Sequence, residues 1–362
     1  VNFQVSGSNA GVAQVLSAFQ TTNVEKFNVS NFQTGAATTT IDAGLMTGLT
    51  NVGLSSSAAT GDTIFTSLKN IVGGEVKNGT ADLTLTYATS AVSGTSDTQS
   101  LTVSNSTAGT FTSDGIETIA ITTETVGSTL TAVVSDKITK LTVAGDQDLT
   151  LTNSTTFAVL TDTATIASTI DASTLTGKLN VTVGDVSTVQ LTGGTADDTL
   201  NMGGTLETND VIDGGAGTNT LTMTAAALTT QFTNVSNIAD VRFNASLTAD
   251  TIDVSKLSTG VTTVGVNVSD QNDGDAAKLA ATISNLTGQT VVLKHSRADD
   301  QDANDSDGNS LFITNATDTA TDTVNVTLDG IGSGSAALDT SWGIDEIDVN
   351  AFETVNIASN TN

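Results

Sequence analysis

The sequence predicts an all-β fold: a parallel β-solenoid or β-roll whose rungs a few short helices cap or interrupt. Short runs of alternating apolar and polar residues recur along the chain, as in half-buried strands. Weak internal repeats suggest stacked units. The chain has no proline, and this mildly favours stacked rungs, because the edges and loops of sandwiches commonly use it. Tandem β-sandwich domains, which alternate in the same way, are the alternative.

Strands are the first elements that the pattern predicts. Clusters of Gly, Asn, Asp and Ser, which favour turns, separate the alternating runs. The clearest runs cover 83–87, 101–103, 149–151, 179–183 and 324–328. Helices are the second kind of element. Apolar residues recur at helical spacing in four places, and we expect a short helix over each of 12–19, 64–72, 228–235 and 279–286.

Two weak repeats organise the strands. The first is a strand pattern that recurs at 24–29, 116–121, 344–349 and 352–357. The second is Ile-Asp followed by Ala or Val and a turn, at 41–48, 170–177 and 252–260. Units this short cannot each enclose a core, so they must stack to bury their Val, Ile and Leu side chains. We therefore expect the Thr and Asn side chains to face outward.

Composition excludes several classes of function. Lys and Arg number 11 against 39 Asp and Glu, for a formal charge of −28. Nucleic acid is excluded as a partner, because its phosphates require clustered bases. No apolar run is long enough for membrane insertion. With no cysteine and one histidine, the chain lacks the usual side chains of acid-base and thiol catalysis, and we expect that it is not an enzyme.

One segment carries a candidate metal chemistry. Residues 193–201 and 214–222 approximate the nonapeptide G-G-x-G-x-D-x-U-x, where U is a large apolar residue, and 209–213 supplies part of a third unit. Stacked turns of this kind would face each other across a gap lined by carboxylates and carbonyls, and calcium takes roughly six to eight such oxygens. We expect calcium binding and folding to be coupled there. Ordinary turns without metal are the alternative. The candidate residues are Gly193, Asp197, Asp198, Asp210, Asp213, Gly214 and Asn219.

Two further acidic clusters are candidate calcium loops. The cluster at 269–275 precedes a predicted helix, and helix capping would explain it equally well. The cluster at 299–309 is the densest acidic stretch, for which a solvated loop is the alternative. The candidate ligands are Asp270, Asp273, Asp275, Asp302, Asp305 and Asp307.

With the length of 362 residues, these motifs suggest three segments. We expect a β-rich segment with short helices over 1–110. A β-solenoid that ends in the degenerate nonapeptides follows over 111–222. A second β-rich segment, with short helices and the acidic loops, completes the chain over 223–362.

The nonapeptides, the turn at 170–177, the strands at 117–121 and 353–357, and the Thr-rich, cysteine-free, acidic composition carry a resemblance. The chain resembles the repeats-in-toxin surface proteins of Gram-negative bacteria, and within them the calcium-dependent S-layer proteins of the Caulobacter type. The resemblance implies type I secretion, an extracellular lattice, a parallel β-roll and calcium as cofactor. It also implies that the sixth-position residues bind calcium, here Asp198, Asp210 and Asn219. Asn219 departs from the family's Asp, and Ala196 from its Gly.

The leading hypothesis is therefore a structural cell-surface protein that assembles with copies of itself into a calcium-stabilised two-dimensional S-layer lattice. Surface polysaccharide or lipopolysaccharide is a further expected partner, through a part that the sequence does not identify. A type I-secreted repeats-in-toxin adhesin or extracellular matrix protein is the alternative. A β-helical polysaccharide lyase or hydrolase is the third hypothesis.

Overall fold

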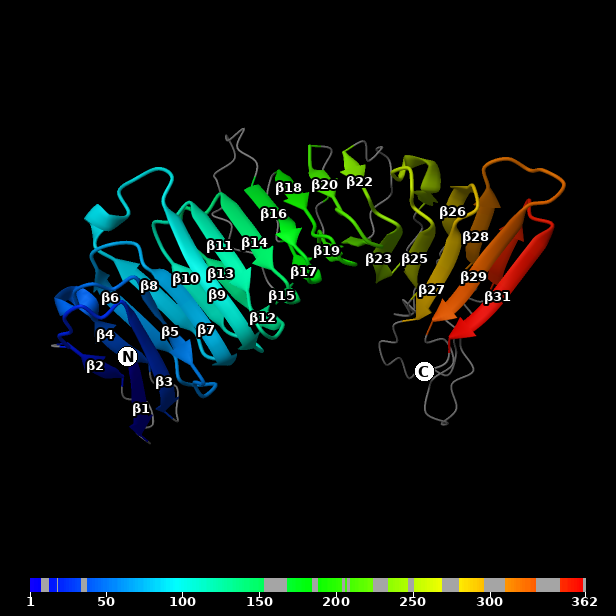
Figure 1. Cartoon of the computed structure of the whole chain (residues 1–362). Coiled ribbons are helices and arrows are strands. Elements are labelled where there is room, and N and C mark those ends of the chain that lie inside the picture. Colours follow the sequence, from blue (N-terminus) through cyan, green and yellow to red (C-terminus); the bar gives the residue numbers. More distant parts are fainter. Residues whose placement is uncertain are drawn as a thin grey trace. The chain divides into compact units, whose positions relative to one another are not determined.

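The protein is a parallel β-solenoid in the computed structural model (Figure 1), and this confirms the predicted fold class. The structure describes residues 1–7, 13–17, 19–33, 38–152, 168–183, 188–203, 206, 209–223, 234–246, 251–268, 280–295, 310–329 and 346–360. Each described strand pair is parallel, as expected for stacked rungs and unlike the antiparallel sheets of tandem β-sandwiches. The chain forms two compact units, one of residues 1–201 and 214–217, the other of 202–213 and 218–362.

The first unit contains three runs of parallel strands. The largest run, in spatial order, is β1 (Asn2–Gly7), β3 (Lys26–Gln33), β5 (Asn51–Ser55), β7 (Gly73–Gly79), β9 (Thr98–Ser106), β11 (Thr118–Thr123), β14 (Lys140–Gly145), β16 (Ser168–Leu175) and β18 (Val189–Thr192). The second is β13 (Ala132–Val134), β10 (Thr110–Ser113), β8 (Leu83–Tyr87), β6 (Thr63–Leu68), β4 (Thr39–Asp42) and β2 (Gln14–Leu16). The third is β12 (Ser128–Leu130), β15 (Leu149–Leu151), β17 (Leu179–Thr182) and β19 (Thr199–Asn201).

The second unit repeats the architecture with three runs of its own. The longest is β21 (Thr220–Met223), β23 (Asp240–Ser246), β25 (Thr263–Val268), β27 (Thr290–His295), β29 (Thr323–Asp329) and β31 (Thr354–Asn360). Another is β24 (Thr251–Asp253), β26 (Ala280–Leu286), β28 (Ser310–Asn315) and β30 (Glu346–Asn350). The shortest pairs β20 (Val211–Asp213) with β22 (Val235–Ser236).

Rows of inward side chains form the core, because strands in parallel register place equivalent residues above one another. One row passes through six strands of the first unit: Phe27, Val52, Gly74, Leu101, Ile121 and Val143. Phe111 of the second sheet occupies the space beside the glycine, since a Cβ at residue 74 would lie 2.9 Å from its ring. The Phe27 and Phe65 rings also meet from the two sheets, with centroids 6.2 Å apart. The core therefore lies between the sheets.

The helix predictions were wrong wherever the structure describes them. The 12–19 segment contains β2, 64–72 overlaps β6 and 279–286 contains β26. Of 228–235, the structure describes only the last two residues, and Val235 begins β22. Among the described residues, the helical elements are three 3₁₀ turns, η1 (Ala43–Leu45), η2 (Thr89–Ala91) and η3 (Val254–Lys256).

Bulges explain two of these errors. In β6 the register shifts between Phe65 and Leu68, beside Ser67 with its φ of 59°. In β26 it shifts between Ile283 and Leu286, beside Asn285 with its φ of 60°. An extra residue in the strand brings two inward side chains to a spacing of three, which in sequence looks like one turn of a helix.

Candidate functional site

The nonapeptide-like residues form stacked turns, as the sequence predicted, and main-chain hydrogen bonds connect these turns. The Ala216 N–H donates to the Gly194 carbonyl at 3.0 Å, and the Thr195 N–H donates to the Leu175 carbonyl at 3.0 Å. Gly215, with a φ of 77°, adopts a conformation that favours glycine. A Cβ there would also lie 2.2 Å from the Gly194 carbonyl oxygen. The turns are thus in direct main-chain contact.

Asp198, at the sixth position of the first nonapeptide, is fully buried. Its Oδ1 accepts the Leu179 N–H at 2.7 Å, and its Oδ2 accepts the Gly194 N–H at 2.5 Å. Burial raises the pKa of this carboxyl, and the two N–H groups oppose that effect. A Cβ at Gly193 would lie 2.6 Å from Oδ2, so this glycine is required for close approach to the carboxylate.

The other candidate residues of the segment differ in exposure. Asn219 is fully buried, and its Nδ2 donates to the Asn237 carbonyl at 3.0 Å. Asp210 is 2% exposed. Asp213 is partly exposed and accepts from the Asn237 side-chain amide at 2.7 Å, whereas Asp197 is exposed. Each of the three sixth-position residues is therefore buried, while acids outside that position are more accessible.

The remaining predicted ligands fall outside the described residues. These are Asp270, Asp273, Asp275, Asp302, Asp305 and Asp307. Within the ranges that the structure does describe, no three Asp, Glu or His side chains come together in a group suited to a metal ion.

Sequence reasoning missed a wider use of acids at the turns. Several carboxylates accept a main-chain N–H from a residue 19 to 31 positions away, in a neighbouring rung. We call such a side chain a clasp: a turn residue that hydrogen-bonds a main-chain group of the adjacent rung. The acidic clasps are Asp62, Asp82, Glu117, Asp136, Asp148, Asp198 and Glu353. The signal in the sequence was the single acid that recurs before a strand, but its partner depends on rung length.

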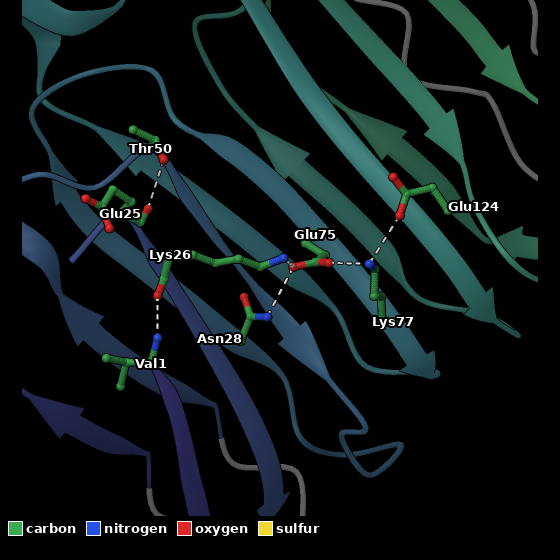
Figure 2. Close-up of polar contacts among 8 residues, drawn as sticks. All are labelled: Val1, Glu25, Lys26, Asn28, Thr50, Glu75, Lys77 and Glu124. Carbon is green, nitrogen blue, oxygen red and sulfur yellow. Dashed lines mark hydrogen bonds and ion pairs between the residues drawn. The ribbon is translucent and has the colours of Figure 1, made fainter.

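A second group that the sequence did not reveal surrounds Glu75, which is 2% exposed on β7. Lys26 and Lys77 approach its carboxylate from opposite sides, each with Nζ 2.5 Å from an oxygen (Figure 2). Asn28 donates to the same group at 3.1 Å. Gly53 lies between Asn28 and Glu75 in the register, and a Cβ there would lie 2.6 Å from the Glu75 Cβ. The glycine therefore leaves room for the buried carboxylate.

The two lysines decide the ionisation of Glu75. Burial alone would raise the pKa of this carboxyl, but hydrogen bonds and charge attraction from Lys26 and Lys77 outweigh it, and the pKa is lowered. Lys77 also pairs with Glu124 at 3.3 Å, so the group contains two bases and two acids. It joins three rungs on the outer face of the sheet.

The polar groups of the nonapeptide-like turns make hydrogen bonds within and between rungs. Both Asp198 oxygens and the Gly194 carbonyl already accept main-chain N–H groups. Asn219 donates from its Nδ2 to the Asn237 carbonyl of the adjacent rung. The arrangement is suited to connecting rungs.

Comparison with known proteins identifies no relative. No family model matches the sequence, no curated protein matches it, and no solved structure matches the fold. In the part of the chain that the structure describes, no helix has the length and apolar character needed to span a bilayer.

Proposed function

We propose that the protein is a structural protein of the extracellular cell surface that assembles with copies of itself into a calcium-stabilised two-dimensional lattice. The observation that carries this proposal is the exposure of apolar side chains on strands of the stack. Val15 on β2 is 63% exposed, and Ile347 on β30 and Ile357 on β31 are 40% and 68% exposed. Exposed apolar side chains are sites where another chain can pack.

The parallel stack also supports a structural role. Solenoids are quasi-one-dimensional, so they present long repeated surfaces on which many copies can make the same contact. The outward positions carry mainly polar residues, as in the row Thr129, Thr150, Asn180 and Thr199. Such a surface suits repeated hydrogen bonding between copies.

Calcium is the proposed cofactor of assembly. Copies with a formal charge of −28 repel one another, and a divalent cation at their contacts would offset that repulsion. The carboxylates that remain accessible, such as Asp197, are those that a neighbouring copy could share. Secretion to the cell surface and attachment to polysaccharide or lipopolysaccharide belong to the same proposal.

Electron microscopy of the purified chain, with millimolar calcium and with chelator, tests this function. We expect ordered sheets with calcium and dispersed particles with chelator. Ile357→Lys should abolish the sheets, because it places a charge at an exposed apolar position of a strand. Val126→Lys is the matched control, since Val126 is 46% exposed at a turn inside the stack. Elongated monomers that stay dispersed in calcium would contradict the lattice and favour the adhesin or matrix alternative.

A further inference from the structure

The sixth position of the nonapeptide-like turns has a role that does not require calcium. At Asp198 the two carboxylate oxygens accept from two different places, Leu179 at the start of β17 and Gly194 in its own turn. Since the side chain is fully buried, these bonds satisfy a charge that water cannot reach. One side chain thereby ties its own turn to the adjacent rung.

The backbone of the turns is engaged in the same manner. In a calcium-binding turn the carbonyl oxygens would be ligands. Here the Gly194 carbonyl accepts the Ala216 N–H of the next turn, and the Leu175 carbonyl accepts the Thr195 N–H. A Cβ on Gly217 would lie 2.5 Å from the Ala196 carbonyl oxygen, so the two turns touch along their length. Main-chain hydrogen bonds therefore connect these turns directly.

Asn219 is the most informative of the sixth-position residues, because it stands where the nonapeptide pattern has Asp. Its Nδ2 donates to the Asn237 carbonyl at 3.0 Å, in the adjacent rung. A carboxylate cannot donate, so Asp at this position would set a negative charge against a carbonyl oxygen in a buried site. Asn219 departs from the calcium nonapeptide, but its amide supplies the donor that the Asn237 carbonyl requires.

We infer that the sixth-position residues Asp198 and Asn219 are clasps matched to main-chain partners, an acceptor for N–H groups and a donor for a carbonyl. The turns that contain Asp198 and Asn219 therefore fold without calcium. This inference goes beyond the proposed function, because it separates folding from assembly. Calcium acts between copies and is not needed to hold these turns.

The variant Asn219→Asp separates the two interpretations because they predict opposite results. If calcium holds the turns, restoring the acid should strengthen binding and raise the thermal midpoint in calcium. If Asn219 is a clasp, the midpoint should fall by about 5 °C, equally in calcium and in chelator, through loss of a buried hydrogen bond. Thr218→Asp is the matched control, since it adds the same charge at the adjacent exposed position and should leave the midpoint within about 1 °C.

Asp198→Asn keeps the inference testable if Asn219→Asp does not fold. The amide would oppose one of the two N–H donors with its own NH₂ group, so we expect a lower midpoint in chelator. A midpoint unchanged in chelator, or one raised by calcium in Asn219→Asp, would overturn the inference. Sheet formation is scored separately by electron microscopy, so failure of the lattice proposal would be recognised independently of these midpoints.

Discussion

Glu75 and Asp198 are both buried carboxylates of the same solenoid, but they have different kinds of partner: charged side chains for Glu75 and main-chain N–H groups for Asp198. Glu75 lies on the outer face of a sheet, between the ammonium groups of Lys26 and Lys77, and its pKa is lowered. Asp198 lies at a turn, where it accepts two main-chain N–H groups, and its pKa is raised by burial. In one region charged side chains stabilise the acid, and in the other region the backbone does.

The difference shows how a chain with few bases accommodates many acids. With 11 Lys and Arg against 39 Asp and Glu, most acids cannot have a basic partner. The strand faces offer no free N–H groups, because the ladders use them, so a buried acid there needs a base. Turns leave N–H groups free, and an acid can serve there as a clasp. The acids at turns are thus part of the architecture.

The largest effect should come from the turn. Asp198→Ala leaves the Leu179 and Gly194 N–H groups buried and without this acceptor, and we expect a loss of about 3 kcal/mol in the free energy of unfolding. Urea unfolding at neutral pH measures it. Asp197→Ala is the control, since that neighbour is exposed and should change stability by less than about 0.5 kcal/mol. Equal effects of the two substitutions would contradict the role of Asp198.

A smaller effect is expected on the sheet face. Glu75→Gln removes the charge that Lys26 and Lys77 share, but the lysines are 50% and 28% exposed and can turn to water. We expect a loss of about 1 kcal/mol, which shrinks further in high salt. Glu124→Gln, at a carboxylate that is 48% exposed, should have almost no effect. A salt-independent loss at Glu75 would show that packing, and not charge, dominates there.

The smallest effect is on the pH dependence of stability. As pH falls, the contribution of Glu75 to stability should decrease, and the contribution of Asp198 should increase. The lowered pKa of Glu75 means that its stabilisation is present above the unfolded value of 4.5 and is lost as pH falls through the folded pKa. The raised pKa of Asp198 means that the folded state takes up its proton first, so stability from this group increases as pH falls toward 3.8.

Urea unfolding at several pH values checks both signs. The stability difference between wild type and Glu75→Gln should narrow below pH 4.5. The difference between wild type and Asp198→Ala should widen over the same range. Parallel pH profiles for the two differences would show that the acids do not differ in the way their partners imply.

Alternation predicted the inward rows, because it depends on local periodicity, and the weak repeats and the absence of proline favoured a stack over sandwiches. Two of the helices were mispredicted because a bulge at Ser67 or Asn285 changes the spacing of inward side chains. Asp198 was located at the correct turn, but its partner Leu179 lies 19 residues away, and rung length varies. The Glu75 group could not be predicted from the sequence. Lys26 is 49 positions from Glu75, and their contact depends on the register of β3, β5 and β7, in which Gly53 lies between the two strands that carry them.

Hydrogen exchange at the Leu179 and Gly194 amides is the most direct measurement of whether clasps hold the nonapeptide-like turns without metal. Each amide donates to Asp198, so its protection reports the clasp itself. We expect slow exchange at both amides in the dispersed chain, with equal rates in chelator and in millimolar calcium. Rapid exchange in chelator that becomes slow only when calcium is added would contradict this expectation.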